Sequence, residues 1–278
     1  MGLFLLILAG SFVYLSHLSA KKKVAVSTKQ VAAPADTGIV NSFAESCLKM
    51  VSEEALFRRT GLQGGYIYPS GNTEYREEAV NPPPASFSGN KVPYFIQATR
   101  VNGFITYNKF VPTLDAISKK LANYVAVEFE KCFKSKVFED IGLDVNSTAS
   151  AKIIADINSE DVSVRLDYPL IIKTHGKESR LDTFAVKLPI RLKALYDSAA
   201  ELVQEIENSG SDAYTITSND CKSFDKNGLT NVYVQNSDSG TNKIVQFVDY
   251  STYGKHYTKS YTFQFAVKNI NVNGNCVG

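Results

Sequence analysis

Four cysteines are the side chains in this 278-residue chain that could form covalent cross-links. Cys47 and Cys132 each lie on the apolar face of a predicted helix, so a bond between them would join two packed helices. Cys221 and Cys276 bracket the end of the chain, and a bond between them would close a loop worth about 4 kcal/mol in the chain-entropy model. Four cysteines allow three pairings, and the sequence does not choose among them. The alternative is four buried free thiols in a cytosolic protein.

No other set of side chains has the spacing of a catalytic or metal-binding motif. No two cysteines have C-x-x-C spacing, and the three histidines, His17, His175 and His256, are far apart in the sequence. The chain has no G-x-S-x-G, H-E-x-x-H or G-x-G-x-x-G sequence. The sequence therefore predicts no catalytic residue, no cofactor and no metal ion, and it gives an enzymatic role no positive support.

The adjacent glycines Gly64 and Gly65 could bring backbone N–H groups close to a phosphate. A phosphate-binding loop, however, follows a strand, precedes a helix and continues with Lys and Ser or Thr. Here a helix comes first and a short strand is expected afterwards. The two glycines therefore predict a helix stop and a tight turn.

Asn146 begins an Asn-Ser-Thr triplet, the acceptor sequence for N-glycosylation in secreted proteins. The composition around it predicts a loop, which would leave the asparagine accessible. Such triplets also occur by chance, so Asn146 is a candidate and not an argument for location.

The amino-terminal residues 2–18, GLFLLILAGSFVYLSHL, contain no Asp, Glu, Lys or Arg. This length is at the short end for a membrane span and is also long enough for the core of a signal peptide. A buried core helix is disfavoured, because the stretch is apolar all round and three lysines follow it at 21–23. The predicted membrane segment includes Gly2, Leu5, Leu8, Phe12, Leu15 and Leu18.

Two details of this segment bear on its fate and orientation. Leu18 stands where a signal-peptide cleavage site would have a small residue, which favours retention as an anchor. The lysines at 21–23 would by themselves place the body on the cytoplasmic side. The cysteines favour the opposite side, and we expect an extracytoplasmic body.

Hydrophobic periodicity predicts an α+β fold. Apolar residues at three-and-four spacing indicate long amphipathic helices over about 39–59 and 113–136, and a third helix over about 192–207. Alternating residues indicate strands at 94–106, 152–157, 162–173 and 183–188, with Pro169 and Pro189 marking edges or bulges. Further strands are expected at 231–235, 244–250 and 261–267. The helices should pack on an antiparallel sheet.

The expected organisation has four parts. Residues 1–20 form a membrane anchor or uncleaved signal helix, and residues 21–38, interrupted by Pro34, form a linker. Residues 39–210 form the α+β body, and the Asn-Ser-Gly-Ser run at 208–211 marks its end. Residues 211–278 form a small C-terminal β module closed by a disulfide.

The composition excludes one class of partner. The formal net charge is +2, and the basic residues are interleaved with acids, so no surface for tracking nucleic-acid phosphates is expected. The chain has 15 Tyr, 16 Phe and no Trp, which suits half-buried strands.

Four stretches resemble an uncharacterised group of archaeal proteins. They are residues 43–48 (FAESCL), 61–67 (GLQGGYI), 188–192 (LPIRL) and 261–267 (YTFQFAV). Proteins of that group begin with one hydrophobic segment. The resemblance covers most of the chain after residue 39, and it implies an outward-facing body without naming an activity or a functional residue.

The apolar start also resembles that of type IV pilin-like subunits, whose amino-terminal helix packs in a filament core. Those subunits carry a glutamate near the beginning, where this chain has Leu5. Their helix continues into the head domain, whereas Pro34 interrupts this one. Both departures separate the chain from an ordinary pilin.

These observations favour a membrane-tethered protein of the cell surface with a structural, adhesion or assembly role, including that of a filament subunit. Its expected partners are the lipid bilayer, other copies of itself and envelope components. One alternative is a module that binds a ligand or glycan through a tyrosine-rich sheet or residues 64–90. An envelope hydrolase with a site assembled from distant residues is a second alternative.

Overall fold

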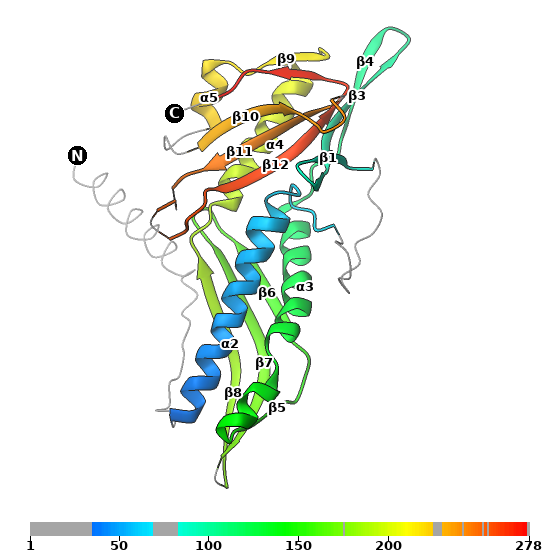
Figure 1. Cartoon of the computed structure of the whole chain (residues 1–278). Coiled ribbons are helices and arrows are strands. Elements are labelled where there is room, and N and C mark those ends of the chain that lie inside the picture. The colour runs from blue at the N-terminus through cyan, green and yellow to red at the C-terminus, as the bar shows by residue number, and fades with distance from the viewer. Residues whose placement is uncertain are drawn as a thin grey trace, which may run out of the picture. The chain divides into compact units, whose positions relative to one another are not determined.

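The computed structural model describes residues 35–68, 83–174, 176–224, 230–240, 242–251, 253–254 and 256–276 (Figure 1). The predicted membrane segment and most of the linker lie outside these residues, as does His175. Within the part of the chain from residue 35 onward that is described, no helix is long and apolar enough to cross a membrane.

Two long helices pack on an antiparallel sheet, as the sequence predicts. Helix α2 (Ala35–Glu54) continues into a π-helix (Ala55–Thr60) and packs against β8, while α3 (Leu114–Cys132) packs against β6 (Figure 1). The sheet consists of β5 (Asp144–Ser147), β6 (Lys152–Ile157), β7 (Val162–Thr174) and β8 (Lys177–Leu188). Strand β7 is central, because it pairs with all three others.

The boundaries of α3 follow from local chemistry. The Thr113 hydroxyl accepts a hydrogen bond from the Ala116 backbone N–H at 3.2 Å, which caps the first turn. The predicted end at residue 136 is wrong, because a 3-10 helix (Ser135–Ile141) follows Cys132 instead. Gly142, with φ of 75°, ends that helix in the left-handed conformation.

The predicted irregularity at Pro169 is confirmed. The register between β7 and β8 shifts between Asp167 and Leu170, so the ladder is interrupted where proline has no N–H to donate. Pro189 comes directly after the end of β8 at Leu188.

A second, five-stranded sheet has the order β10-β11-β12-β3-β4. Its members are β10 (Thr230–Asn236), β11 (Lys243–Asp249), β12 (Tyr261–Lys268), β3 (Tyr94–Val101) and β4 (Phe104–Lys109). Helix α4 (Leu192–Asn208) packs on β11 and β12, and the ring of Tyr196 lies edge-on to Phe263. The short helix α5 (Ser218–Phe224) lies beside α4.

Strand pairing crosses the boundary predicted at 208–211. Strand β12 pairs in parallel with β3, with Ala266 opposite Tyr94 and Val267 opposite Ile96. Strands of the expected C-terminal module and strands of the expected body therefore share one sheet. Two small sheets, β1 (Ala85–Phe87) with β2 (Asn90–Val92) and β9 (Ala213–Thr215) with β13 (Asn271–Asn273), complete the described structure.

The two disulfides form between the cysteines that were paired from their positions in the sequence. Cys47 of α2 is bonded to Cys132 of α3, which ties together the two helices on the first sheet. Cys221 of α5 is bonded to Cys276, which follows β13. No cysteine is left free. Two disulfides in one chain indicate an oxidising, extracytoplasmic environment.

Candidate functional site

The most exposed structure of the second sheet is the hairpin of β3 and β4, which projects past the other strands in Figure 1. Its turn consists of Asn102 and Gly103, whose φ angles are 51° and 85°. Two positive φ angles in a two-residue turn define type I′, and Asn-Gly is the sequence that this turn prefers. The sequence predicted strand structure over 94–106, and the Asn-Gly pair was the signal that could have located the turn.

The hairpin is buried at its base and exposed at its tip. Phe95 and Ile96, near the start of β3, are fully buried, and the ring of Phe95 stacks on Phe265 at 4.6 Å. At the tip, Val101 and Phe104 are direct cross-strand partners and are 50% and 77% exposed. An apolar pair at the end of a projecting hairpin is a surface suited to contact with another molecule.

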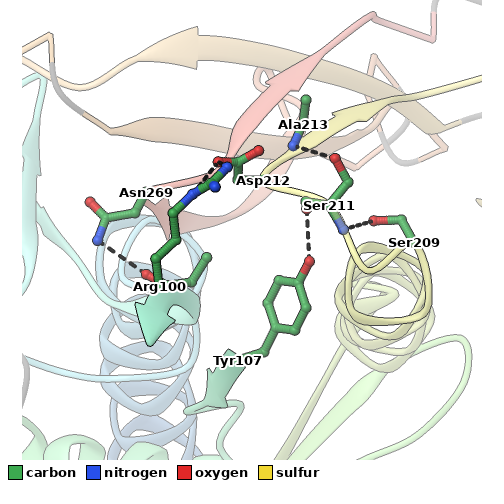
Figure 2. Close-up of polar contacts among 8 residues, drawn as sticks. Arg100, Tyr107, Ser209, Ser211, Asp212, Ala213 and Asn269 are labelled. Atoms are coloured by element: carbon green, nitrogen blue, oxygen red, sulfur yellow. Dashed lines mark hydrogen bonds and ion pairs between the residues drawn. The ribbon is translucent and has the colours of Figure 1, made fainter. Parts of the chain in front are cut away.

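The hairpin is fixed at its middle and near its tip by the turn that follows α4 (Figure 2). The Arg100 guanidinium donates to Asp212 Oδ2 from Nε at 3.2 Å and from Nη2 at 2.5 Å. The Tyr107 hydroxyl donates to the Ser211 carbonyl at 2.7 Å. Each strand of the hairpin thus has its own contact with residues 211–212, so the predicted boundary is a fixed turn.

The turn is itself ordered by short-range hydrogen bonds. The Ser209 hydroxyl accepts from the Ser211 backbone N–H at 3.3 Å, and the Ser211 hydroxyl accepts from Ala213 at 3.2 Å (Figure 2). On the far side of β3, the Asn269 amide donates to the Ala98 carbonyl at 3.1 Å. These contacts hold the hairpin from both neighbouring segments.

Charge also stabilises this junction. The hydrogen bond from Arg100 lowers the pKa of the Asp212 carboxyl, and the hydrogen bond from Lys109 lowers the pKa of Glu207. Burial raises the pKa of the Tyr107 hydroxyl, which keeps it protonated as a donor. Because the ion pairs are exposed, they orient the hairpin more than they stabilise the fold.

The two edges of the five-stranded sheet differ. On β10, Val232 exchanges two backbone hydrogen bonds of 2.9 Å with Cys276, and the Val234 N–H donates to the Asn275 side chain at 2.9 Å. On the other side, β4 is the last strand, and among the described residues no further strand pairs with it. Within the described part of the chain, residues 275–276 cover the β10 edge and no strand covers the β4 edge.

A separate small cavity of about 210 Å³ lies at the start of α4. Two of its charged groups pair with each other, Lys193 with Asp197 at 2.5 Å, and the Ser223 hydroxyl donates to Glu201. Arg191 forms two hydrogen bonds with buried Asp249. No group of three or more His, Cys, Asp or Glu residues within the described ranges could hold a metal ion. The contacts join α4 to α5 and β11, which is a structural role.

The paired glycines form the predicted helix stop and turn. Gly64 and Gly65 have φ angles of 54° and 80°, and a Cβ on Gly65 would lie 2.5 Å from Ile117 Cδ1. The expected strand directly after them does not form at residues 66–68. Gly65 passes directly against α3, and Gly64 passes against β12, where a Cβ would lie 2.8 Å from the Gln264 carbonyl oxygen.

Asn146 lies in a strand, so the loop predicted for it is wrong. It belongs to β5, where it pairs with Ile171 of β7, and its side chain is exposed. Alternating burial along β5 places Val145 in the core and Asn146 outside, which keeps the asparagine accessible.

No family model, no curated protein and no solved structure matches this chain. The fold and the chemistry of its surfaces therefore carry the functional argument. They define a disulfide-bonded α+β protein of an extracytoplasmic environment, with one open sheet edge that ends in an exposed hairpin.

Proposed function

We propose that this protein is a membrane-tethered, extracytoplasmic surface protein that assembles with other copies of itself through β4. The proposal rests on the difference between the two edges of the five-stranded sheet. The β10 edge is covered by residues 275–276, whereas the β4 edge is open and leads to Val101 and Phe104. An open strand edge offers unpaired N–H and C=O groups to a further strand.

The sequence of β4 lacks the usual protection of an edge strand. Soluble proteins place lysines, prolines or bulges on exposed edges to prevent pairing. Residues 104–108, FITYN, contain no charge and no proline. Lys109, the one charged residue of β4, is paired with Glu207 at 2.5 Å. The edge can therefore accept another strand without opposing charge.

Attachment to one membrane would favour assembly by raising the local concentration of the protein. Copies held in one membrane by residues 2–18 would meet at a high effective concentration, so a weak contact between strands would suffice. Both disulfides fit the extracytoplasmic side of that membrane. A rigid hairpin also loses little conformational entropy on binding.

Sedimentation velocity of the full chain in detergent tests the proposal. In a hairpin closed by a two-residue turn, the backbone groups of Ile105 face outward, so Ile105→Pro removes an N–H that a new strand would use. Phe104→Ser removes the apolar tip. We expect the wild type to self-associate and each variant to associate at least about tenfold more weakly, a loss of ~1.4 kcal/mol.

Val137→Ser is the matched control, because Val137 is 47% exposed on the 3-10 helix, outside the hairpin. Its association should equal that of the wild type. A wild-type chain that stays monomeric at all concentrations, or a control that dissociates like Phe104→Ser, contradicts the proposal. Electron microscopy of cell surfaces with and without Ile105→Pro distinguishes filaments from smaller assemblies.

A further inference from the structure

The outer face of β10 and β11 carries a group of uncharged polar side chains. Alternation along the strands turns Val232 and Phe247 inward, where Phe247 meets Phe224 of α5 at 5.6 Å. Of the residues of opposite parity, Ile244 and Val248 are buried, whereas the polar ones lie on the outer face, and Tyr253 follows them in the turn after β11. We call this group the tyrosine–glutamine face; its members are Asn231, Tyr233, Gln235, Gln246, Tyr250 and Tyr253.

Three glutamines on neighbouring strands form a chain of hydrogen bonds across the sheet. Gln235 Nε2 donates to Gln246 Oε1 at 3.0 Å, and Gln246 Nε2 donates to Gln264 Oε1 at 2.8 Å. The chain ends inside the protein, where Gln264 Nε2 donates to the Leu62 carbonyl at 2.7 Å. Gln264 is 1% exposed, so its amide cannot exchange these partners for water.

The buried end fixes the orientation of every amide in this chain. A backbone carbonyl only accepts, so Gln264 must present its NH₂ group to Leu62 and its oxygen to Gln246. Gln246 in turn uses its NH₂ group toward Gln264, so its oxygen faces Gln235 and accepts from it. Gln235 therefore donates inward, and its carbonyl oxygen, which accepts from none of the described residues, is presented to solvent. The solvent end of the chain is a prearranged acceptor.

The tyrosines supply the complementary donor and an apolar surface. The Tyr233 hydroxyl accepts from the Asn231 amide at 3.1 Å. The Tyr233 hydroxyl also forms a hydrogen bond with Tyr250. A phenol hydroxyl both donates and accepts, so Tyr233 can pair with either end of a ligand hydroxyl group. The Tyr250 and Tyr253 rings, 39% and 56% exposed, lie edge-on at 6.5 Å.

The partly exposed Tyr233 hydroxyl and the exposed Gln235 acceptor lie two residues apart on β10, and together with the exposed rings of Tyr250 and Tyr253 they suit one class of ligand. A sugar ring has a C–H face that packs on tyrosine and hydroxyl groups that both donate and accept. All six side chains are uncharged, so they offer no ionic attraction to a phosphate or a carboxylate. An extended peptide would use a strand edge, and residues 275–276 already occupy that of β10.

We propose that the tyrosine–glutamine face binds an uncharged oligosaccharide, with aromatic packing on Tyr250 and Tyr253 and hydrogen bonds to Gln235 Oε1 and the Tyr233 hydroxyl. The site is independent of the assembly role. It lies on the face of β10 and β11, and β12 and β3 separate it from the edge of β4. Either function can therefore be lost while the other is kept.

The test is isothermal titration of the full chain with chitotriose, mannotriose, cellotriose and lactose. The protein is kept in a detergent without a sugar headgroup, because a glycoside detergent would compete. We expect at least one oligosaccharide to bind. Tyr253→Ala and Gln235→Leu should each weaken that binding about tenfold, or ~1.4 kcal/mol.

Tyr233→Phe distinguishes the contribution of the ring to binding from that of the hydroxyl, since it keeps the aromatic surface and removes the hydroxyl group. It should weaken binding and lower the melting temperature only slightly, because the partly exposed partners of the hydroxyl can bond to water instead. Phe104→Ser, on the hairpin, is the control and should bind like the wild type. The proposal is overturned if none of the four oligosaccharides binds, if binding is unchanged in Tyr253→Ala and Gln235→Leu, or if extended peptides bind this face instead.

Discussion

The two edges of the five-stranded sheet differ in whether another segment of the described chain is hydrogen-bonded to them. At the β10 edge, backbone and side-chain hydrogen bonds attach residues 275–276, and a disulfide from Cys276 to Cys221 secures them. At the β4 edge, the described residues add no strand, and the hairpin ends in exposed Val101 and Phe104. A sheet with one covalently secured edge can be extended in one direction only. If copies associate by strand pairing as proposed, this disulfide would restrict that pairing to the β4 edge.

Each side also contains an arginine–aspartate pair, and the two pairs differ in burial. On the covered side, Arg191 and Asp249 are 7% and 0% exposed and meet at 2.7 Å. On the open side, Arg100 and Asp212 are 62% and 40% exposed and meet at 2.5 Å. A buried pair leaves an uncompensated charge when one partner is lost, whereas an exposed pair leaves a solvated one. The buried Arg191–Asp249 pair therefore matters for the stability of the fold, whereas the exposed Arg100–Asp212 pair mainly orients the hairpin.

The largest effect is expected from removing the disulfide of the covered edge. Cys221 and Cys276 are 55 residues apart, and Cys221→Ser with Cys276→Ser should lower the free energy of unfolding by about 4 kcal/mol, measured by denaturant unfolding. Loss of residues 275–276 from the edge should also expose β10. Sedimentation velocity should then show a second mode of association.

The matched control is Cys47→Ser with Cys132→Ser, since that disulfide closes 85 residues but joins two helices. Its loss of stability should be similar, because loop entropy grows slowly with length. Its association should match that of the wild type. If both double variants associate alike, the disulfide does not limit association at the β10 edge.

A slightly smaller effect is expected from breaking the buried ion pair. Arg191→Met leaves the Asp249 carboxylate buried, with Ser251 donating to it from N–H and hydroxyl at 2.8 and 3.0 Å. The free energy of unfolding should fall by about 3 kcal/mol. Adding Asp249→Asn should recover part of this loss, because an amide accepts from Ser251 without a charge. Further destabilisation by the second substitution would show that the buried charge is not the cause.

The smallest effect concerns the exposed pair and its dependence on pH. The hydrogen bond from Arg100 lowers the pKa of Asp212, so its stabilisation is present above the unfolded pKa and is lost as the pH falls through the folded pKa. Acid should therefore loosen the attachment of the hairpin at Arg100 in the wild type. Amide hydrogen exchange of β3 and β4 should show this as reduced protection, after correction for the intrinsic rate.

Asp212→Asn is the control for this titration, because the amide cannot ionise. Its hairpin should be less protected at neutral pH and should lose little more protection in acid. An acid-induced change of equal size in the variant would assign the effect to another group. Glu207 also has a lowered pKa through Lys109, so Glu207→Gln resolves the two contributions.

The sequence predicted the local elements well because their signals are local. Apolar periodicity located α2, α3 and α4, and the hydroxyl at Thr113 marked the start of α3. Pro169 marked the bulge in β7 because an imide nitrogen cannot donate. The same reasoning missed α5 and the short strands, whose few residues carry little periodicity.

By itself the sequence determined the long helices and strands and offered the two cysteine pairs that the structure bonds. Only the tertiary structure decided that β12 lies beside β3, that the end of the chain covers β10, and that the glutamine chain ends at Leu62. The physical reason is distance along the chain. Helix formation depends on residues within a few turns, whereas the partner of a strand depends on which distant segments bury their apolar faces together.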